Sequence, residues 1–332
     1  MAHEIAFITN KQTGKKQACF AYYGEVPWHK LGQGVSEAMT SAVAMEQAGL
    51  DWKVRKEPLW YGLKPDVALP LAEHFAMVRT SDDFALGVVG KRYVPVQNDE
   101  VFSFMDGLVE GGELRYHTAG ALREGRKVFL LAKVHSDPLE VVPGDLVEQY
   151  ILATNSHDGS GSMQVMFTTV RVVCQNTLNL AVNAHKHKGG TTVFIKHMGK
   201  IESKKDTARK ILGIAKDRMS AFEKAARALS RIPMDPPTFK QFTLQLVGDG
   251  KTETEQQKVQ EVRRILGENF EQGAGTDLVG VKNTRWAALN AVTDYTTHVH
   301  GTGASGSTRF MSTFAGAGND LNQRAYVMLQ AA

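Results

Sequence analysis

The sequence has little of what several protein classes need. It holds only two cysteines, Cys19 and Cys174, too few for a disulfide framework or a cysteine-rich zinc site. We expect both to be small buried apolar residues in a reducing compartment. The longest apolar runs, such as Val128–Ala132 and Val170–Cys174, have the length of a strand, and the first residues lack the apolar segment of a signal peptide. We therefore expect a cytoplasmic protein with no membrane span.

Motifs for catalysis are also scarce. Gly248–Thr252 reads GDGKT, but Gln245 occupies the position where a phosphate-binding loop needs its first glycine, so we interpret the segment as a polar turn between a strand and a helix. Asp82 and Asp83 lie at an expected turn, and no nucleophile elbow is present. Neighbouring histidines lack the further ligands of a metal site: His185, His187 and His197, and His298 with His300. We therefore expect no enzyme activity, no cofactor and no metal.

The composition and the hydrophobic pattern favour an α+β fold. Hydrophobic residues make up 42% and charged residues 22%, an ordinary balance for a chain with a buried core. Glycine-rich residues 156–162 predict a tight hairpin, and hence an antiparallel pair. The pattern predicts an antiparallel sheet built on a β-β-β-α unit: strands over Arg126–Val134, Val147–Asn155 and Met163–Cys174, then a helix over Asn176–Ala184. Upstream it predicts a helix from Ser36 to Ala48, a strand over Trp52–Trp60, a meander over Met77–Thr80, Phe84–Val89 and Arg92–Gln97, and a helix capped by Asn98 or Asp99.

A long amphipathic helix is expected from Ser203 to about Arg231. Apolar residues recur at three- and four-residue steps and form one stripe: Ala208, Ile211, Leu212, Ala215, Met219, Phe222, Ala226 and Leu229. Three further helices are expected over Glu253–Leu266, Asn283–Val299 and Asp320–Leu329. The chain is thus predicted to divide into an α+β body over residues 1–232, with a nucleic-acid-binding core at about 120–232, and a mainly helical region over 238–332.

The net charge is only +4, but it is unevenly distributed. Between His185 and Arg231 there are nine lysines and four arginines against four acidic residues. Such a local excess can attract phosphate even in a nearly balanced chain. The expected helix carries basic residues on its other faces: Lys204, Lys205, Arg209, Lys210, Lys216, Arg218, Lys224, Arg227 and Arg231. A solvated helix face explains these residues equally well.

The segment His185–Lys200 indicates a nucleic-acid interface more strongly. It places Lys186, Lys188, Lys196 and Lys200 near Phe194. Lysines that neutralise phosphates release counterions, and single-strand binders add aromatic faces on which bases stack. Candidates for stacking are Phe194, Trp28 and Tyr93, and candidates for phosphate contacts on the following helix are Lys204, Lys205 and Arg209.

Several blocks together resemble a known family. They are Val26–Gly32 (VPWHKLG), Ala48–Val54 (AGLDWKV), Tyr93–Val109 (YVPVQNDEVFSFMDGLV), Thr168–Ala181 (TTVRVVCQNTLNLA) and Thr284–His300 (TRWAALNAVTDYTTHVH). In this order they are similar to the phage/plasmid-like protein family known as domain of unknown function 932. The resemblance implies mobile DNA in a bacterial cytoplasm, but no defined activity. Within these blocks, Trp28, His29 and Trp286 are explained as well by packing as by function.

The β-β-β-α order is also similar to the core of single-strand annealing proteins of the RecT, Red-beta and Erf types. This more distant resemblance implies a homo-oligomer, a ring or filament, that holds single strands along a basic groove. It would place Arg171 and Asn176 near that groove, with Lys186, Lys188, Lys196 and Lys200 on phosphates. Arg171 on an outer strand face and Asn176 as a helix cap are the structural alternatives.

The sequence therefore favours a protein of a phage or plasmid that binds single-stranded DNA, as an accessory to annealing or recombination. The alternative is an interaction protein that inhibits a host defence or replication factor. A nuclease is a third class, but it would need a metal cluster that the spacing does not supply.

Overall fold

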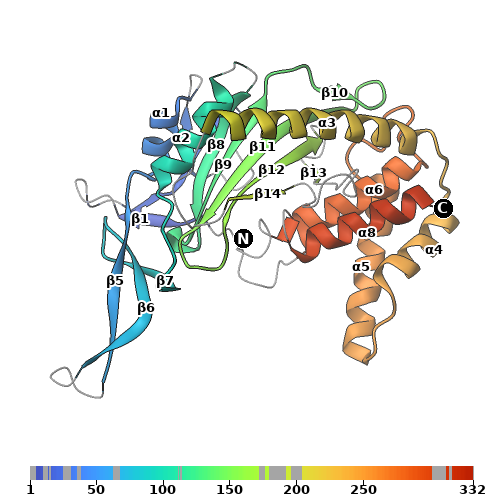
Figure 1. Cartoon of the computed structure of the whole chain (residues 1–332). Helices are drawn as coiled ribbons and strands as arrows, with labels where there is room; N and C mark the ends of the chain where they lie inside the picture. The colour runs from blue at the N-terminus through green and yellow to red at the C-terminus, as the bar shows by residue number, and fades with distance from the viewer. Residues whose placement is uncertain are drawn as a thin grey trace.

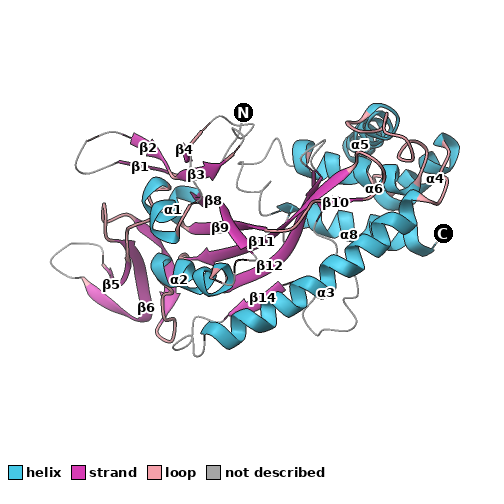
Figure 2. Cartoon of the chain, turned by 90° about the horizontal axis from the view of Figure 1, so that it is seen from above, coloured by secondary structure: helices cyan, strands magenta, loops and turns pink. Residues whose placement is uncertain are grey.

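The computed structural model describes most of the chain. Described are residues 5–9, 14, 16–24, 31–35, 39–62, 68–110, 112, 114–171, 176–178, 192–195, 204–300, 312–313 and 316–331. For residues 171, 176–178, 192–195, 204–212 and 331 only the backbone is described. The fold is α+β, with sheets in the N-terminal half and a helical C-terminal part, as the sequence predicts (Figures 1 and 2).

Within the described residues, a sheet of nine strands forms the centre of the N-terminal half. Its strands follow the order β13-β12-β11-β9-β8-β3-β4, with β10 paired to β11 and β14 paired to β12, and only β3–β4 is parallel. The strands are β3 (Phe20–Tyr23), β4 (Gln33–Val35), β8 (Leu114–Leu122), β9 (Lys127–Val134), β10 (Leu139–Glu140), β11 (Leu146–Ser156), β12 (Met163–Arg171), β13 (Asn176–Leu178) and β14 (Thr192–Ile195). A separate pair joins β1 (Phe7–Thr9) to β2 (Lys16–Ala18).

A three-stranded antiparallel sheet projects from this body. It consists of β5 (Val54–Tyr61), β6 (Leu69–Arg79) and β7 (Ala85–Gly90), with β6 in the middle. Within the described residues, β7 pairs only with residues 74–78 of β6, so the distal part of β5–β6 is a two-stranded arm there. This arm extends away from the body at the lower left of Figure 1.

Buried hydrogen bonds hold the three-stranded sheet against the nine-stranded sheet. Asn98 Nδ2 donates to the carbonyl oxygens of Leu50 at 3.0 Å and Trp52 at 3.3 Å, and Asn98 Oδ1 lies 2.9 Å from Nε2 of buried His157. A Cβ added at Gly87 in β7 would lie 2.6 Å from Asp158 Cα, so only glycine permits this approach to the β11–β12 turn. Buried hydrogen bonds of this kind fix one arrangement because every alternative leaves a polar group unpaired.

Three helices cover one face of the large sheet: α1 (Ser41–Gln47), α2 (Asn98–Val109) and α3 (Lys204–Ser230). Gln97 and Glu100 close a capping box at the start of α2. The predicted stripe of α3 is confirmed where side chains are described, because Ala215, Phe222, Ala226 and Leu229 are buried. α3 has 27 residues, about 40 Å at the helical rise, and runs across the top of Figure 1 from the sheet to the C-terminal helices.

Two large hydrophobic cores lie along α3. The first contains Ala215, together with residues of α1, α2 and the sheet. The second contains Phe222 and Leu229, together with the C-terminal helices and the β10–β11 end of the sheet. The C-terminal elements are α4 (Pro236–Val247), α5 (Glu253–Gln272), α6 (Arg285–Asp294), the π-helical turn η4 (Tyr295–Val299) and α8 (Ala317–Ala331). The predicted division of the chain into two regions at residues 232–238 stays a prediction. α3 and the β10–β11 part of the sheet connect the two cores.

Several local predictions are wrong. Residues 176–178 form strand β13 rather than the start of a helix, because they pair with Thr169–Arg171 of β12. Residues 92–97 form no strand, since they lead into the cap of α2 at Gln97. The helix α1 begins at Ser41 after an N-cap by Thr40, and strand β8 was missed. Gly248–Thr252 joins two helices rather than a strand and a helix.

Candidate nucleic-acid interface

The predicted basic interface is only partly described. Lys186, Lys188, Lys196 and Lys200 lie outside the described residues. Phe194 lies in β14, where its backbone pairs with Gln164 of β12, and Lys204, Lys205 and Arg209 lie in the first turns of α3; none of these four side chains is described. The backbone therefore places residues 192–195 beside β12 in the sheet and residues from 204 onward in the covering helix α3. The roles of the side chains between His185 and Arg209 stay predictions.

Arg171 and Asn176 are neighbours in the sheet. Arg171 ends β12 and Asn176 begins β13, and the two residues are direct partners in the antiparallel register. β13 in turn lies against α6 and η4. The predicted helix cap at Asn176 is thus replaced by a strand position. The backbone register places Arg171 and Asn176 opposite each other, and their position near a nucleic-acid groove stays a prediction.

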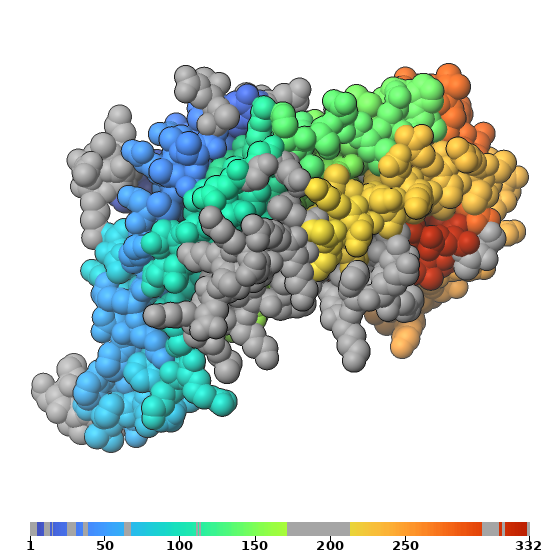
Figure 3. Space-filling view, turned by 45° about the horizontal axis from the view of Figure 1, so that its top comes forward, coloured from blue at the N-terminus to red at the C-terminus, as the bar shows by residue number. Residues whose placement is uncertain are grey.

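The described side chains of α3, together with Arg231 directly after it, present a basic row to solvent. Lys216, Lys224, Arg227 and Arg231 are exposed and follow one another at helical steps. Arg227 Nη2 lies 3.2 Å from Glu223 Oε1, but both side chains are 45% exposed, so water and salt compete with this ion pair. The yellow part of α3 lies on the surface facing the viewer in Figure 3.

Arg218 departs from the expected pattern. The sequence assigns it to the basic face, whereas its side chain is only 4% exposed. Desolvation by burial lowers the pKa of its guanidinium below the ordinary value. This arginine therefore cannot reach a phosphate chain on the outer side of α3, and the basic row is narrower than the sequence predicts.

The aromatic candidates are not equivalent. Tyr93 is half-buried, its hydroxyl donates to the carbonyl oxygen of Ser156 at 2.9 Å, and desolvation raises its pKa. Trp286 is fully buried, and its Nε1 donates to Asp145 Oδ2 at 2.7 Å. Both are packing residues with a satisfied polar atom, so neither offers a free face to a base. Trp28 lies outside the described residues.

Sequence reasoning missed a titratable cluster on the large sheet. Glu148 accepts hydrogen bonds from Lys133 Nζ and from the Tyr150 hydroxyl, and the ring of His117 stands edge-on to Tyr150 at 5.2 Å. Burial raises the pKa of Tyr150 and lowers that of His117, whereas bonds from Lys133 and Tyr150 outweigh desolvation and lower the pKa of Glu148. The cluster is internally satisfied. The period-2 spacing of Glu148 and Tyr150 was its only sequence signal.

A second polar cluster surrounds the π-helical turn. Thr296 Oγ1 donates to Asn322 Oδ1 at 2.9 Å, and Thr313 Oγ1 donates to the carbonyl oxygen of Thr296 at 3.2 Å. All three residues are buried. Within the described part of the chain, Asn322 Nδ2 has no hydrogen-bond partner. π-Helical turns often occur at functional sites, but this one contains only neutral hydroxyl and amide groups besides His298 and His300.

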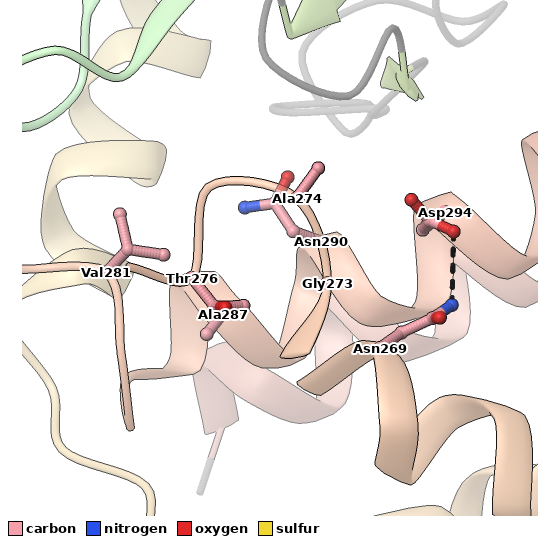
Figure 4. A pocket seen from close by; sticks show the side chains of 8 residues that line it. All are labelled: Asn269, Gly273, Ala274, Thr276, Val281, Ala287, Asn290 and Asp294. Atoms are coloured by element: carbon pink, nitrogen blue, oxygen red, sulfur yellow. Dashed lines mark hydrogen bonds between the residues drawn. The ribbon is translucent and has the colours of Figure 1, made fainter. Parts of the chain in front are cut away.

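A small hollow lies beside this turn (Figure 4). Figure 4 shows Asn269, Asn290 and Asp294 around it, with Asn269 Nδ2 donating to Asp294 Oδ1 at 3.2 Å. Its volume of about 10 Å³ is room for a single water molecule. It is too small for a substrate or a nucleotide base.

The segments that resemble catalytic motifs, Gly248–Thr252 and Asp82–Asp83, have structural roles where the structure describes them. Thr252 and Glu255 form a capping box at the start of α5, and Asp249 pairs with Arg263 at 2.7 Å, so the GDGKT turn caps a helix. Asp82 accepts two bonds from buried Arg79, each at 2.7 Å. Over the described residues, no group of three or more His, Cys, Asp or Glu side chains could hold a metal ion. Among those same residues, no helix is both long and apolar enough to cross a bilayer.

The model of one protein family matches residues 85–319, more than two thirds of the chain. The chain belongs to the family described as Domain of unknown function (DUF932). The match runs from β7 to the beginning of α8 and leaves β5 and β6 outside it. No curated protein matches the chain, and no solved structure does. The family resemblance in the sequence is thereby confirmed, whereas the similarity to single-strand annealing proteins stays a hypothesis.

Two family-like blocks meet in the DUF932 region. The block over Thr168–Ala181 contributes β13, and the block over Thr284–His300 contributes α6 and η4, which lie against β13. Trp286 in the second block also binds Asp145, 141 positions away, at the β10–β11 end of the sheet. These blocks therefore join the sheet to the helical part.

Proposed function

We propose that the protein binds nucleic acid, with single-stranded DNA as the preferred ligand, and that it serves a phage or plasmid as an accessory to annealing or recombination. The observation that carries the proposal is the separation of charge: thirteen of the 39 basic residues fall between His185 and Arg231, where only four acidic residues occur. A phosphate chain is the common ligand of such an excess.

The exposed row on α3 supports this proposal. Lys216, Lys224, Arg227 and Arg231 give the row a repeating positive charge on the outer side of the helix. At steps of three and four residues back along α3, the same row passes through Arg209 and Lys205. These residues lie close to the point where the basic segment, His185–Lys200, leads into α3. A strand of nucleic acid lying along the row would thus meet both the helix and the segment before it.

Charge reversal tests the proposal. The variant K186E/K188E/K196E/K200E is compared with K16E/K251E/K258E/K282E, which changes the net charge equally at exposed lysines elsewhere in the chain. Fluorescence anisotropy of a labelled single-stranded oligonucleotide gives the affinity at several salt concentrations. Each lost phosphate contact should reduce the slope of log K against log salt by about 0.7, so four contacts reduce it by about 3.

The control variant should keep most of the wild-type slope. Equal losses in both variants would mean that only the overall charge matters, and would overturn the proposed interface. Negligible binding by the wild-type protein at low salt would overturn the function itself.

A further inference from the structure

The distal arm of β5–β6 exposes apolar side chains to an unusual degree. Trp60 is 60% exposed, Tyr61 56%, Leu69 53% and Leu71 41%. The register pairs Trp60 with Pro70 and Tyr61 with Leu69, so Tyr61, Leu69 and Leu71 lie on one face of a short stretch of ribbon and Trp60 lies on the other. A two-stranded ribbon is marginal in water by itself, and contiguous exposed apolar groups usually mark an interaction surface. In Figure 3 the light-blue arm stands out from the body at the lower left.

The arm is poorly suited to a phosphate chain. Residues 58–72 contain one lysine and one aspartate and no other charge. Four basic groups at its base are engaged: Lys53 by Asp99, Arg55 by Glu57 and Asp83, Lys91 by Glu73, and Lys56 by the carbonyl oxygens of residues 90, 91 and 93. A neutral, apolar surface of this kind fits a protein partner.

Strand addition is also disfavoured on the arm. Within the described residues β5 pairs only with β6, so its other side is a sheet edge. Pro58 interrupts that edge because it has no N–H, and Glu73 on β6 has a φ of 65° beside a shift in register. The arm therefore presents its side chains rather than its backbone.

A surface of matching character lies at the opposite end of the molecule. α4 and α8 pack together there, with Leu244 of α4 42% exposed and Val327 of α8 59% exposed. These two helices carry only Lys240, Asp320 and Arg324 among their charged residues, whereas α5 alone carries eight. Figures 1 and 2 both place the arm at one end and α4 with α8 at the other.

We propose that the arm of one protomer docks on the α4–α8 surface of a second copy of this chain. Tyr61, Leu69 and Leu71 on one face of the arm, with Trp60 on the other face, supply one side of the contact, and Leu244 and Val327 supply exposed apolar groups on the other side. Because the two patches differ and lie at opposite ends, the contact is heterologous. It repeats from copy to copy and yields a closed ring or an open filament. This inference does not depend on nucleic-acid binding.

Complementary variants test the contact in the full-length protein. The arm variant W60S/Y61S/L71S removes apolar side chains from the arm. The receiver variant L244K/V327K places charges on the α4–α8 surface on which the arm would dock. Sedimentation velocity should show concentration-dependent oligomers for the wild-type protein and at least tenfold weaker association for each variant alone. An equimolar mixture of the two variants should form a 1:1 dimer that grows no further, since one intact arm and one intact surface remain.

The variant V279S provides a control, because Val279 is 84% exposed but lies in neither patch, and it should assemble like the wild-type protein. Thermal unfolding followed by circular dichroism shows that the variants fold. A wild-type monomer at all concentrations would overturn the proposal. So would oligomers that persist in either variant, or a mixture that stays monomeric. Flotation of the wild-type protein, but not of the arm variant, with neutral phosphatidylcholine vesicles would assign the arm to a lipid surface instead.

Discussion

The helical core and the sheet half of this protein differ in the polar groups that accompany their buried aromatic residues. In the helical core the large buried groups are aromatic: Phe239 stacks on Phe270 at 4.1 Å, and Trp286 stands edge-on to Phe222 at 6.3 Å. In the sheet half, the joint between the small and large sheets depends on Asn98 and His157, and the large sheet holds the cluster around His117. Both halves bury large aromatic side chains and hydrogen-bonded polar groups. A histidine whose pKa is lowered by burial, His117, lies in the sheet half, so pH should affect the stability of that half.

The largest effect should come from Trp286→Ala. This change leaves a cavity in the helical core and removes the hydrogen bond that Asp145 Oδ2 accepts at a buried site, so the free energy of unfolding should fall by about 3–5 kcal/mol. Urea denaturation measures it. The matched control is Trp60→Ala on the arm, which should change the stability of the monomer by less than about 0.5 kcal/mol. Similar losses of unfolding free energy in Trp286→Ala and Trp60→Ala would contradict the expected role of burial.

A smaller loss is expected from Asn98→Ala. The substitution removes the donor to two carbonyl oxygens and the acceptor for His157, all at a buried site, and should cost about 1–3 kcal/mol. Gln245→Ala, on the exposed side of α4, is the control. If urea denaturation showed no difference between these variants, the sheet joint would owe its stability to apolar contacts instead.

The sheet half should also respond to pH through His117. Burial lowers the pKa of folded His117 below its ordinary value of 6.5, so below this pH the unfolded chain binds a proton that the folded chain excludes. Stability that is present above pH 6.5 is therefore lost as the pH falls toward the folded pKa. The Glu148 contribution is lost only below its ordinary pKa of 4.5.

His117→Gln should flatten the free energy of unfolding between pH 7 and pH 5 relative to the wild-type protein. Urea denaturation across this range measures the change. An unchanged slope in the variant would show that His117 does not contribute to this dependence.

The nucleic-acid proposal and the arm proposal concern surfaces rather than either core. Charge reversal at the basic segment should alter salt-dependent binding without changing assembly, and the arm variants should alter assembly without unfolding the chain. If the arm variants also lost DNA affinity, the two surfaces would be coupled through the oligomer, because neighbouring copies would then extend one binding row.

Local patterns in the sequence determined much of this fold. Period-2 alternation and a glycine-rich turn are enough for the β11–β12 hairpin, and a three- and four-residue apolar repeat is enough for α3 and α8, because these signals depend only on residues close in the chain. The concentration of positive charge after residue 185 and the kinship with DUF932 are also properties of the sequence alone.

Tertiary structure decided the rest, since the deciding partners are distant in the chain or depend on packing. β8 has a bulge between Tyr116 and Thr118 that breaks its alternation. Residues 176–178 have the composition of a helix start, but pairing with β12 makes them a strand. Arg218 lies three residues after Ala215 and four before Phe222, at the edge of the apolar stripe, and the packing of α3 buries it there. Trp286 donates a hydrogen bond to Asp145, which lies 141 positions earlier in the chain. A one-dimensional pattern predicts which face of an element is apolar, but only the assembled fold determines what that face meets.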